Sequence, residues 1–99
     1  MRVLIESRSA ADLRLVVKDA LASLHQVLEF PERDSLSERA RHLLGVEHFA
    51  TLAMACAAAG DWRGSSSNLL HALDSERALL GEAAPLRAAL TRARFVVAA

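Results

Sequence analysis

Two segments of the chain repeat the same short motif. Ser37-Glu38-Arg39-Ala40 precedes Leu43-Leu44-Gly45, and Ser75-Glu76-Arg77-Ala78 precedes Leu79-Leu80-Gly81. A repeat of about 20–50 residues is typical of stacked helical units, because one such unit cannot bury its apolar face alone. The repeat therefore predicts a helical scaffold that binds another protein, and it leaves the partner unnamed.

Composition agrees with one small helical domain spanning residues 1–99. Hydrophobic residues make up 53% of the chain, and alanine, the best helix former, is common. The 12 acidic and 12 basic side chains cancel, so no net charge attracts nucleic acid or an anionic membrane. The single cysteine cannot form an internal disulfide, and no apolar run is long enough to cross a bilayer. We expect a soluble, cytoplasmic protein.

Capping and periodicity signals predict where the first helices begin and end. Ser9 and Asp12 form a capping-box pattern that opens a helix near residue 10, and Pro31 ends it. A second capping box, Ser35 with Glu38, opens the next helix. Gly45 either ends that helix or lies inside a longer helix that reaches Ala59, and the break is favoured because glycine commonly follows a helix C-terminus. The apolar stripe of the first helix comprises Leu13, Val17, Ala20, Leu24 and Val27.

The second half of the chain carries a corner and a final helix. Gly60-Asp61-Trp62 predicts a tight turn with Asp61 capping the next helix, so that Leu52 and Cys56 would face Leu69 and Leu73. Pro85 suits the first turn of a last helix, on which Leu86, Leu90, Ala93 and Val97 share one side.

The two ends of the chain offer an alternative to a purely helical fold. Val3-Leu4-Ile5 and Phe95-Val96-Val97 could pair as short strands, but two isolated strands are only marginally stable. The predicted class is therefore all-α, with four to five helices in antiparallel hairpins stacked as a short solenoid.

The spacing from Val46 to Leu79 resembles a tetratricopeptide repeat. Phe49, Leu52, Ala53 and Cys56 match the first helix of that family, and Gly60-Asp61-Trp62 matches its turn. The segment from Leu44 to Ala53 is similar to the signature of kinesin-light-chain-type repeats, with Phe49 in place of proline. The match makes residues 37–80 a repeat hairpin and 81–99 a second partial repeat or capping helix, and leaves residues 1–34 unmatched.

The resemblance implies a protein–protein interaction or assembly module with no catalytic activity of its own. Its partner would be a protein, a peptide or a second copy of this chain, bound without cofactor. The alternative is an accessory helical domain of a larger bacterial enzyme or regulator, such as a glycosyltransferase or a regulatory ATPase. Family geometry places the following residues on the partner-binding side: Glu47, Ala50, Thr51, Met54, Ala57, Ala58 and Trp62.

Other chemistry has weaker support in the sequence. The pairs His25 with Glu29 and Glu38 with His42 have helical spacing that suits one edge of a metal site, but surface pairs of this kind usually bind nothing. His48 is expected to hydrogen-bond at a helix corner rather than to catalyse. No nucleophile motif surrounds the serines that precede His71. We therefore expect neither a catalytic nor a metal site.

Residues 40–52 also fit a helix-turn-helix with its turn at Gly45, the best nucleic-acid alternative. Glu47 would then lie at the start of the helix that contacts DNA, where an acidic side chain in a neutral domain disfavours binding. We therefore expect no nucleic-acid partner.

Overall fold

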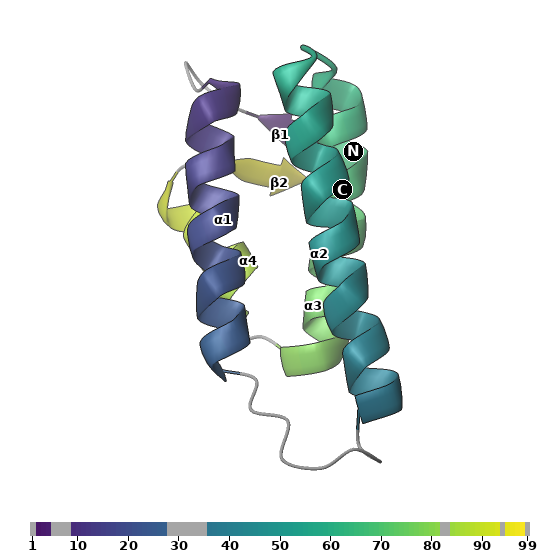
Figure 1. The fold of residues 1–99 in the computed structure, drawn as a ribbon. Coiled ribbons are helices and arrows are strands. Elements are labelled where there is room, and N and C mark those ends of the chain that lie inside the picture. The colour runs from purple at the N-terminus through teal and green to yellow at the C-terminus, as the bar shows by residue number, and fades with distance from the viewer. Residues whose placement is uncertain (1, 5–8, 28–35, 82–83, 94, 99) are drawn as a thin grey trace.

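The computed structural model describes residues 2–4, 9–27, 36–81, 84–93 and 95–98. In chain order the elements are β1 (Arg2–Leu4), α1 (Ala10–Val27), α2 (Leu36–Ala58), α3 (Trp62–Leu80), α4 (Pro85–Arg92) and β2 (Val96–Ala98). Successive helices run antiparallel, the α2–α3 pair lies beside α1, and α4 lies behind α1 (Figure 1). The predicted fold of packed helices is confirmed, with two short strands added.

The predicted capping box opens α1. The Asp12 backbone N–H donates to Ser9 Oγ at 3.2 Å, and the Ser9 N–H donates to Asp12 Oδ2 at 3.1 Å. These two bonds satisfy donors that a helix N-terminus otherwise leaves free. The predicted stripe is confirmed in its first four residues, which are at most 3% exposed. The Val27 side chain, Pro31 and the proposed Ser35–Glu38 capping box lie outside the described residues.

The favoured helix break at Gly45 is wrong, because α2 passes through this residue without interruption. Gly45 instead marks a close approach between α2 and α3. A Cβ atom at this position would lie 2.9 Å from Ser75 Oγ and 3.4 Å from Ser75 Cβ. The glycine therefore accommodates a neighbouring helix, which spacing along the chain could not reveal. The helix-turn-helix alternative loses its turn for the same reason.

Enlarging Gly45 should separate α2 from α3. We expect Gly45→Leu to lower the free energy of unfolding by about 2–3 kcal/mol, since overpacking of this kind forces the backbone to move. Gly45→Ala should change it by less than about 1 kcal/mol, because the gain in helix propensity offsets the contact with Ser75. Chemical denaturation measures both, with Ala22→Leu on the exposed side of α1 as the control. A Gly45→Leu variant as stable as this control would contradict the close approach.

The corner at Gly60-Asp61-Trp62 is confirmed. Gly60 has a φ of 80°, a backbone conformation that favours glycine, and Asp61 Oδ1 accepts a hydrogen bond from the Gly64 N–H at 2.9 Å. Cys56 does contact α3, but the neighbour there is Asn68, whose Nδ2 lies 3.9 Å from the Cys56 Sγ, rather than the predicted Leu69 or Leu73. The prediction for Leu52 is wrong, since this residue is 39% exposed. The buried face of α2 is instead formed by Leu43, Val46, Ala50, Ala53 and Ala57.

The last helix is shorter than predicted, and the chain ends in a strand. Helix α4 ends at Arg92, and Val97 belongs to β2 rather than to the helix. β1 and β2 pair antiparallel, with Arg2 opposite Ala98, Val3 opposite Val97 and Leu4 opposite Val96. This pairing, disfavoured from the sequence, is stable because the strands are not isolated. β1 packs against α3, and the adjacent Phe95 is buried.

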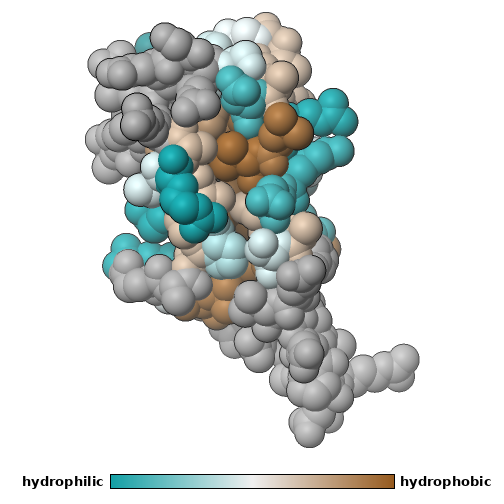
Figure 2. Space-filling view, turned by 90° about the vertical axis from the view of Figure 1, so that its left-hand side faces the viewer, coloured by the Kyte–Doolittle hydropathy of each residue, from teal (hydrophilic) through white to brown (hydrophobic). Residues whose placement is uncertain are grey.

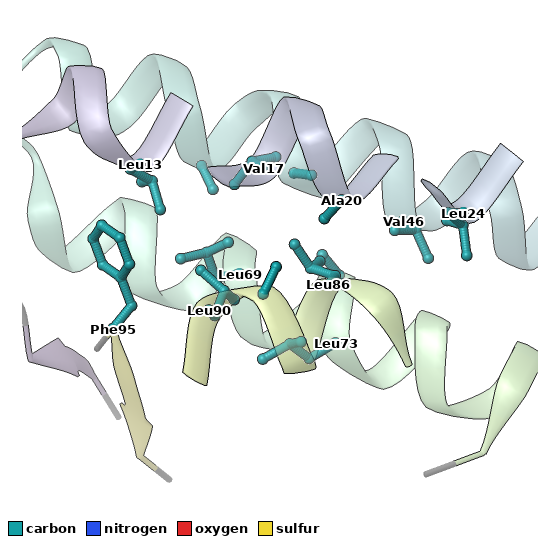
Figure 3. Close-up of a cluster of buried hydrophobic side chains, with 14 of the residues drawn as sticks. Leu13, Val17, Ala20, Leu24, Val46, Leu69, Leu73, Leu86, Leu90 and Phe95 are labelled. Atoms are coloured by element: carbon teal, nitrogen blue, oxygen red, sulfur yellow. The ribbon is translucent and has the colours of Figure 1, made fainter. Parts of the chain in front are cut away.

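The core is aliphatic and draws on all four helices. Figure 3 shows Leu13 and Val17 of α1 facing Leu69 of α3 and Leu90 of α4, with Phe95 below Leu13. Leu86 and Leu90 are the large buried side chains of α4, so this short helix is held mainly by two leucines. Trp62 is half-buried and packs against the edge of the same core.

Candidate functional site

The seven residues predicted to bind a partner do not form one accessible face. Ala50 and Ala57 are 0% and 3% exposed and lie in the core, so their prediction as partner-binding residues is corrected. The physical reason is that α1, unmatched to the repeat, packs against α2 and buries the side expected to be concave. Among the remaining five, Thr51 and Ala58 are exposed, and Glu47, Met54 and Trp62 are half-buried.

The exposed side of α2, which includes Thr51 and Ala58, forms a distinctive surface. Its exposed residues recur every three or four positions, which places them on one helix face. Leu44 is 63% exposed and Leu52 is 39% exposed, although isolated exposed leucines are ordinary in themselves. Leu44 and Leu52 are unusual because their exposed neighbours on the same helix face include no Asp, Glu, Lys or Arg. We define the outer face of α2 as Leu44, His48, Thr51, Leu52, Ala55, Ala58 and Ala59.

The outer face of α2 carries no Asp, Glu, Lys or Arg side chain. Between Arg41 and Asp61 the only Asp, Glu, Lys or Arg is Glu47, which is half-buried and borders this face, three residues after Leu44 and four before Thr51. A solvent-facing helix side normally carries several charges. The outer face therefore has the chemistry of a surface that another apolar surface can cover.

Helix α1 provides the contrast. Leu15 is 70% exposed there, but Arg14, Lys18 and Asp19 are exposed beside it on the same helix. Viewed from the α1 side, hydrophobic residues at the centre are flanked by hydrophilic residues (Figure 2). Since charged groups must be desolvated when a surface is covered, this side of the molecule is less suited to an apolar contact than the outer face of α2.

An aromatic cluster joins α2 to α3 beside the outer face. The Phe49 ring lies 5.2 Å from the His48 ring, edge-on, and 5.0 Å from the His71 ring, as measured between ring centroids. Both histidines are exposed, while Phe49 is half-buried. The expected corner role of His48 is wrong, because this residue lies within continuous α2 and no corner exists there.

A buried carboxylate holds the N-terminus of α4. Ala84, at the N-cap, has no side-chain oxygen, and Pro85 has no N–H to donate. The next two donors bond to Glu76 of α3, from Leu86 N to Oε2 at 2.7 Å and from Arg87 N to Oε1 at 3.0 Å. Glu76 is 0% exposed. It therefore replaces the local cap that the sequence of α4 lacks and ties α4 to α3.

Opposing effects act on the ionisation of Glu76. Burial raises the pKa of its carboxyl group, because a charge is disfavoured away from water. The two backbone N–H donors and the Arg87 guanidinium lower the pKa, but burial outweighs them. The arrangement fits a structural group better than a reactive one, since both carboxylate oxygens accept bonds from the backbone.

The described residues contain a small pocket near this cap, between α3 and α4. Its cavity volume is about 40 Å³, and it is lined by Leu73, Arg87, Leu90, Thr91 and Phe95. A site for a small organic ligand usually needs roughly 300 Å³ or more. The pocket is therefore large enough for a few water molecules rather than for a substrate.

Other candidate chemistry is not brought together in the part of the chain that the structure describes. There, no three His, Cys, Asp or Glu side chains lie close enough to hold a metal ion. The side chains of His25, Glu29 and Glu38 lie outside the described residues, so both proposed metal pairs do as well. Ser65 and Ser66 are fully buried, whereas His71 is exposed. Within the described helices, none is both long and apolar enough to span a membrane.

Comparison with protein-family models, with curated proteins and with solved structures finds no match to this chain. The resemblance to tetratricopeptide repeats therefore stays a prediction from the sequence.

Proposed function

We propose that this chain is a protein–protein interaction module that binds its partner through the outer face of α2. The observation that carries the proposal is the exposure of Leu44 and Leu52 on a helix face that has no Asp, Glu, Lys or Arg. Covering a leucine that is largely exposed contributes roughly 1–2 kcal/mol, and covering the neighbouring alanines adds to it. An apolar helix or groove on the partner is the complementary surface.

The hairpin geometry supports the same proposal. α2 and α3 are long antiparallel helices joined by the tight corner at Gly60, so the outer face is held on a rigid support. The tetratricopeptide resemblance favours an interaction role as well, although the proposed surface shares only Thr51 and Ala58 with the residues that the resemblance implies. The module acts by binding and has no catalytic step of its own.

Site-specific photo-crosslinking tests this proposal in cells that express the full chain. A benzophenone amino acid at Ala55, on the outer face, should yield a covalent adduct of defined mass. The same probe at Ala22, an exposed alanine of α1, serves as the matched control and should yield little or none. Adding Leu44→Glu to the Ala55 probe variant should reduce the adduct at least tenfold, because a carboxylate would have to be desolvated in the contact. Equal adduct yields at Ala55 and Ala22 would contradict the proposal.

A further inference from the structure

We infer that the partner of the outer face is a second copy of this chain, with the two α2 helices packed antiparallel about a two-fold axis near Thr51. This inference rests on the proposed function and specifies its partner. A two-fold interface uses the same patch on both copies, so the patch must be complementary to itself. The outer face meets this requirement in shape and in charge.

The shape of the outer face is complementary to itself when the two helices run in opposite directions. Leu44 and Ala58 lie seven residues on either side of Thr51, and each is exposed. An antiparallel pair would therefore place the large side chain of one copy against the small side chains near Ala58 and Ala59 of the other. Large residues that fit over small ones allow helix axes to approach to about 8–10 Å.

Charges beyond the two ends of the outer face favour the same direction. Arg41 and Asp61 are exposed and lie ten residues before and after Thr51. Arg41 belongs to α2, whereas Asp61 follows the end of α2 in the corner, where its Oδ1 caps α3. In an antiparallel pair, the guanidinium of one copy approaches the carboxylate and the C-terminal carbonyl groups of α2 in the other, which carry partial negative charge. A parallel pair would instead place arginine near arginine and aspartate near aspartate. Charge complementarity therefore selects the antiparallel arrangement.

The size of the face sets the expected strength of association. α2 has 23 residues and is about 34 Å long, and only one side of it is available. A contact along one helix face is smaller than the standard interface of about 1,600 Å². We therefore expect a reversible dimer with a dissociation constant in roughly the micromolar range, rather than a permanent one.

Sedimentation equilibrium over a wide range of concentrations tests the association. The wild-type chain should change from monomer to dimer as concentration rises. Leu44→Glu should weaken the dimer at least tenfold. The matched control is Leu15→Glu, which adds the same charge at an exposed leucine of α1 and should leave the dimer intact. Circular dichroism on each variant verifies that the helices are retained.

Disulfide crosslinking tests the direction of the two helices, in a Cys56→Ala background that removes the native thiol. Under mild oxidation, Thr51→Cys should crosslink to itself. Leu44→Cys should crosslink poorly to itself but well to Ala58→Cys in a mixture of the two variants. Efficient crosslinking of Leu44→Cys to itself would overturn the antiparallel arrangement.

The outcomes separate this inference from the function on which it rests. A chain that stays monomeric at all concentrations, but forms an Ala55 photo-adduct with a different protein, would overturn the second copy as partner and leave the interaction module standing. A monomeric chain without a selective adduct at Ala55 would overturn both. A dimer equally weakened by Leu44→Glu and Leu15→Glu would overturn the assignment to the outer face.

Discussion

Phe95→Ala should lower the free energy of unfolding by about 3–5 kcal/mol, the typical loss for a large aromatic side chain in a core. Phe95 is 2% exposed and lies between Leu13 of α1 and Leu90 of α4 (Figure 3). Its backbone N–H also donates to the Leu90 carbonyl at 2.8 Å. Because the residue directly precedes β2, its truncation should loosen the strand pair together with the helix core.

Urea denaturation followed by circular dichroism measures the effect of Phe95→Ala. Leu15→Ala is the control, because Leu15 is 70% exposed and its truncation should change the free energy of unfolding by less than about 0.5 kcal/mol. Phe95→Leu keeps most of the apolar volume and should show an intermediate loss. If Phe95→Ala were as stable as Leu15→Ala, the placement of Phe95 in the core would be refuted.

Glu76→Ala should lower the free energy of unfolding by about 3–4 kcal/mol. The substitution leaves the N–H groups of Leu86 and Arg87 without their acceptor, and each buried unpaired donor costs about 1–3 kcal/mol. Glu76→Gln keeps one carbonyl oxygen and avoids burying a charge, so it should cause about half of this loss. Denaturation of the three proteins at one pH measures the series. Equal stability of all three would contradict the capping role.

The same residue should make stability depend on pH. Burial raises the pKa of Glu76 above that of the unfolded chain, so the folded state binds the proton more tightly. The resulting stabilisation is fully present below the ordinary pKa of glutamate and is lost as pH rises through the raised value. Unfolding measured from about pH 4 to about pH 8 should show this decline in the wild type and a smaller one in Glu76→Gln. A wild-type profile without this decline would contradict a raised pKa for Glu76 in the folded chain.

Local sequence rules predicted the parts of the fold that depend on local chemistry. The capping box at Ser9 and Asp12 and the corner at Gly60 each involve residues a few positions apart, whose bonds are fixed by backbone geometry. The stripe of α1 follows from helical periodicity and was predicted for the same reason. Neither the capping and corner motifs nor the apolar periodicity requires a contact between segments that are distant in the sequence.

The features that sequence rules missed depend on elements that meet only in the folded chain. Gly45 matches a helix stop, but its role is set by Ser75 on α3. Glu76 lies in the repeated motif, yet its function as a cap depends on α4, where Ala84 and Pro85 leave two donors unsatisfied. The absence of a local cap before Pro85 was the one sequence signal for such a distant acceptor. Likewise, the sequence shows that no Asp, Glu, Lys or Arg lies between Glu47 and Asp61, but burial decides which side of that helix is exposed.

The β1–β2 pair has a consequence for the order in which the molecule is assembled. Its register joins residues from opposite ends of the chain, whereas α2 and α3 meet through a tight corner. Contacts between distant residues form more slowly, because a longer loop must be closed first. During synthesis, the α2–α3 hairpin is therefore available early, while β1 waits until β2 leaves the ribosome. β1 precedes the other described elements in the chain and is the last of them to find its partner.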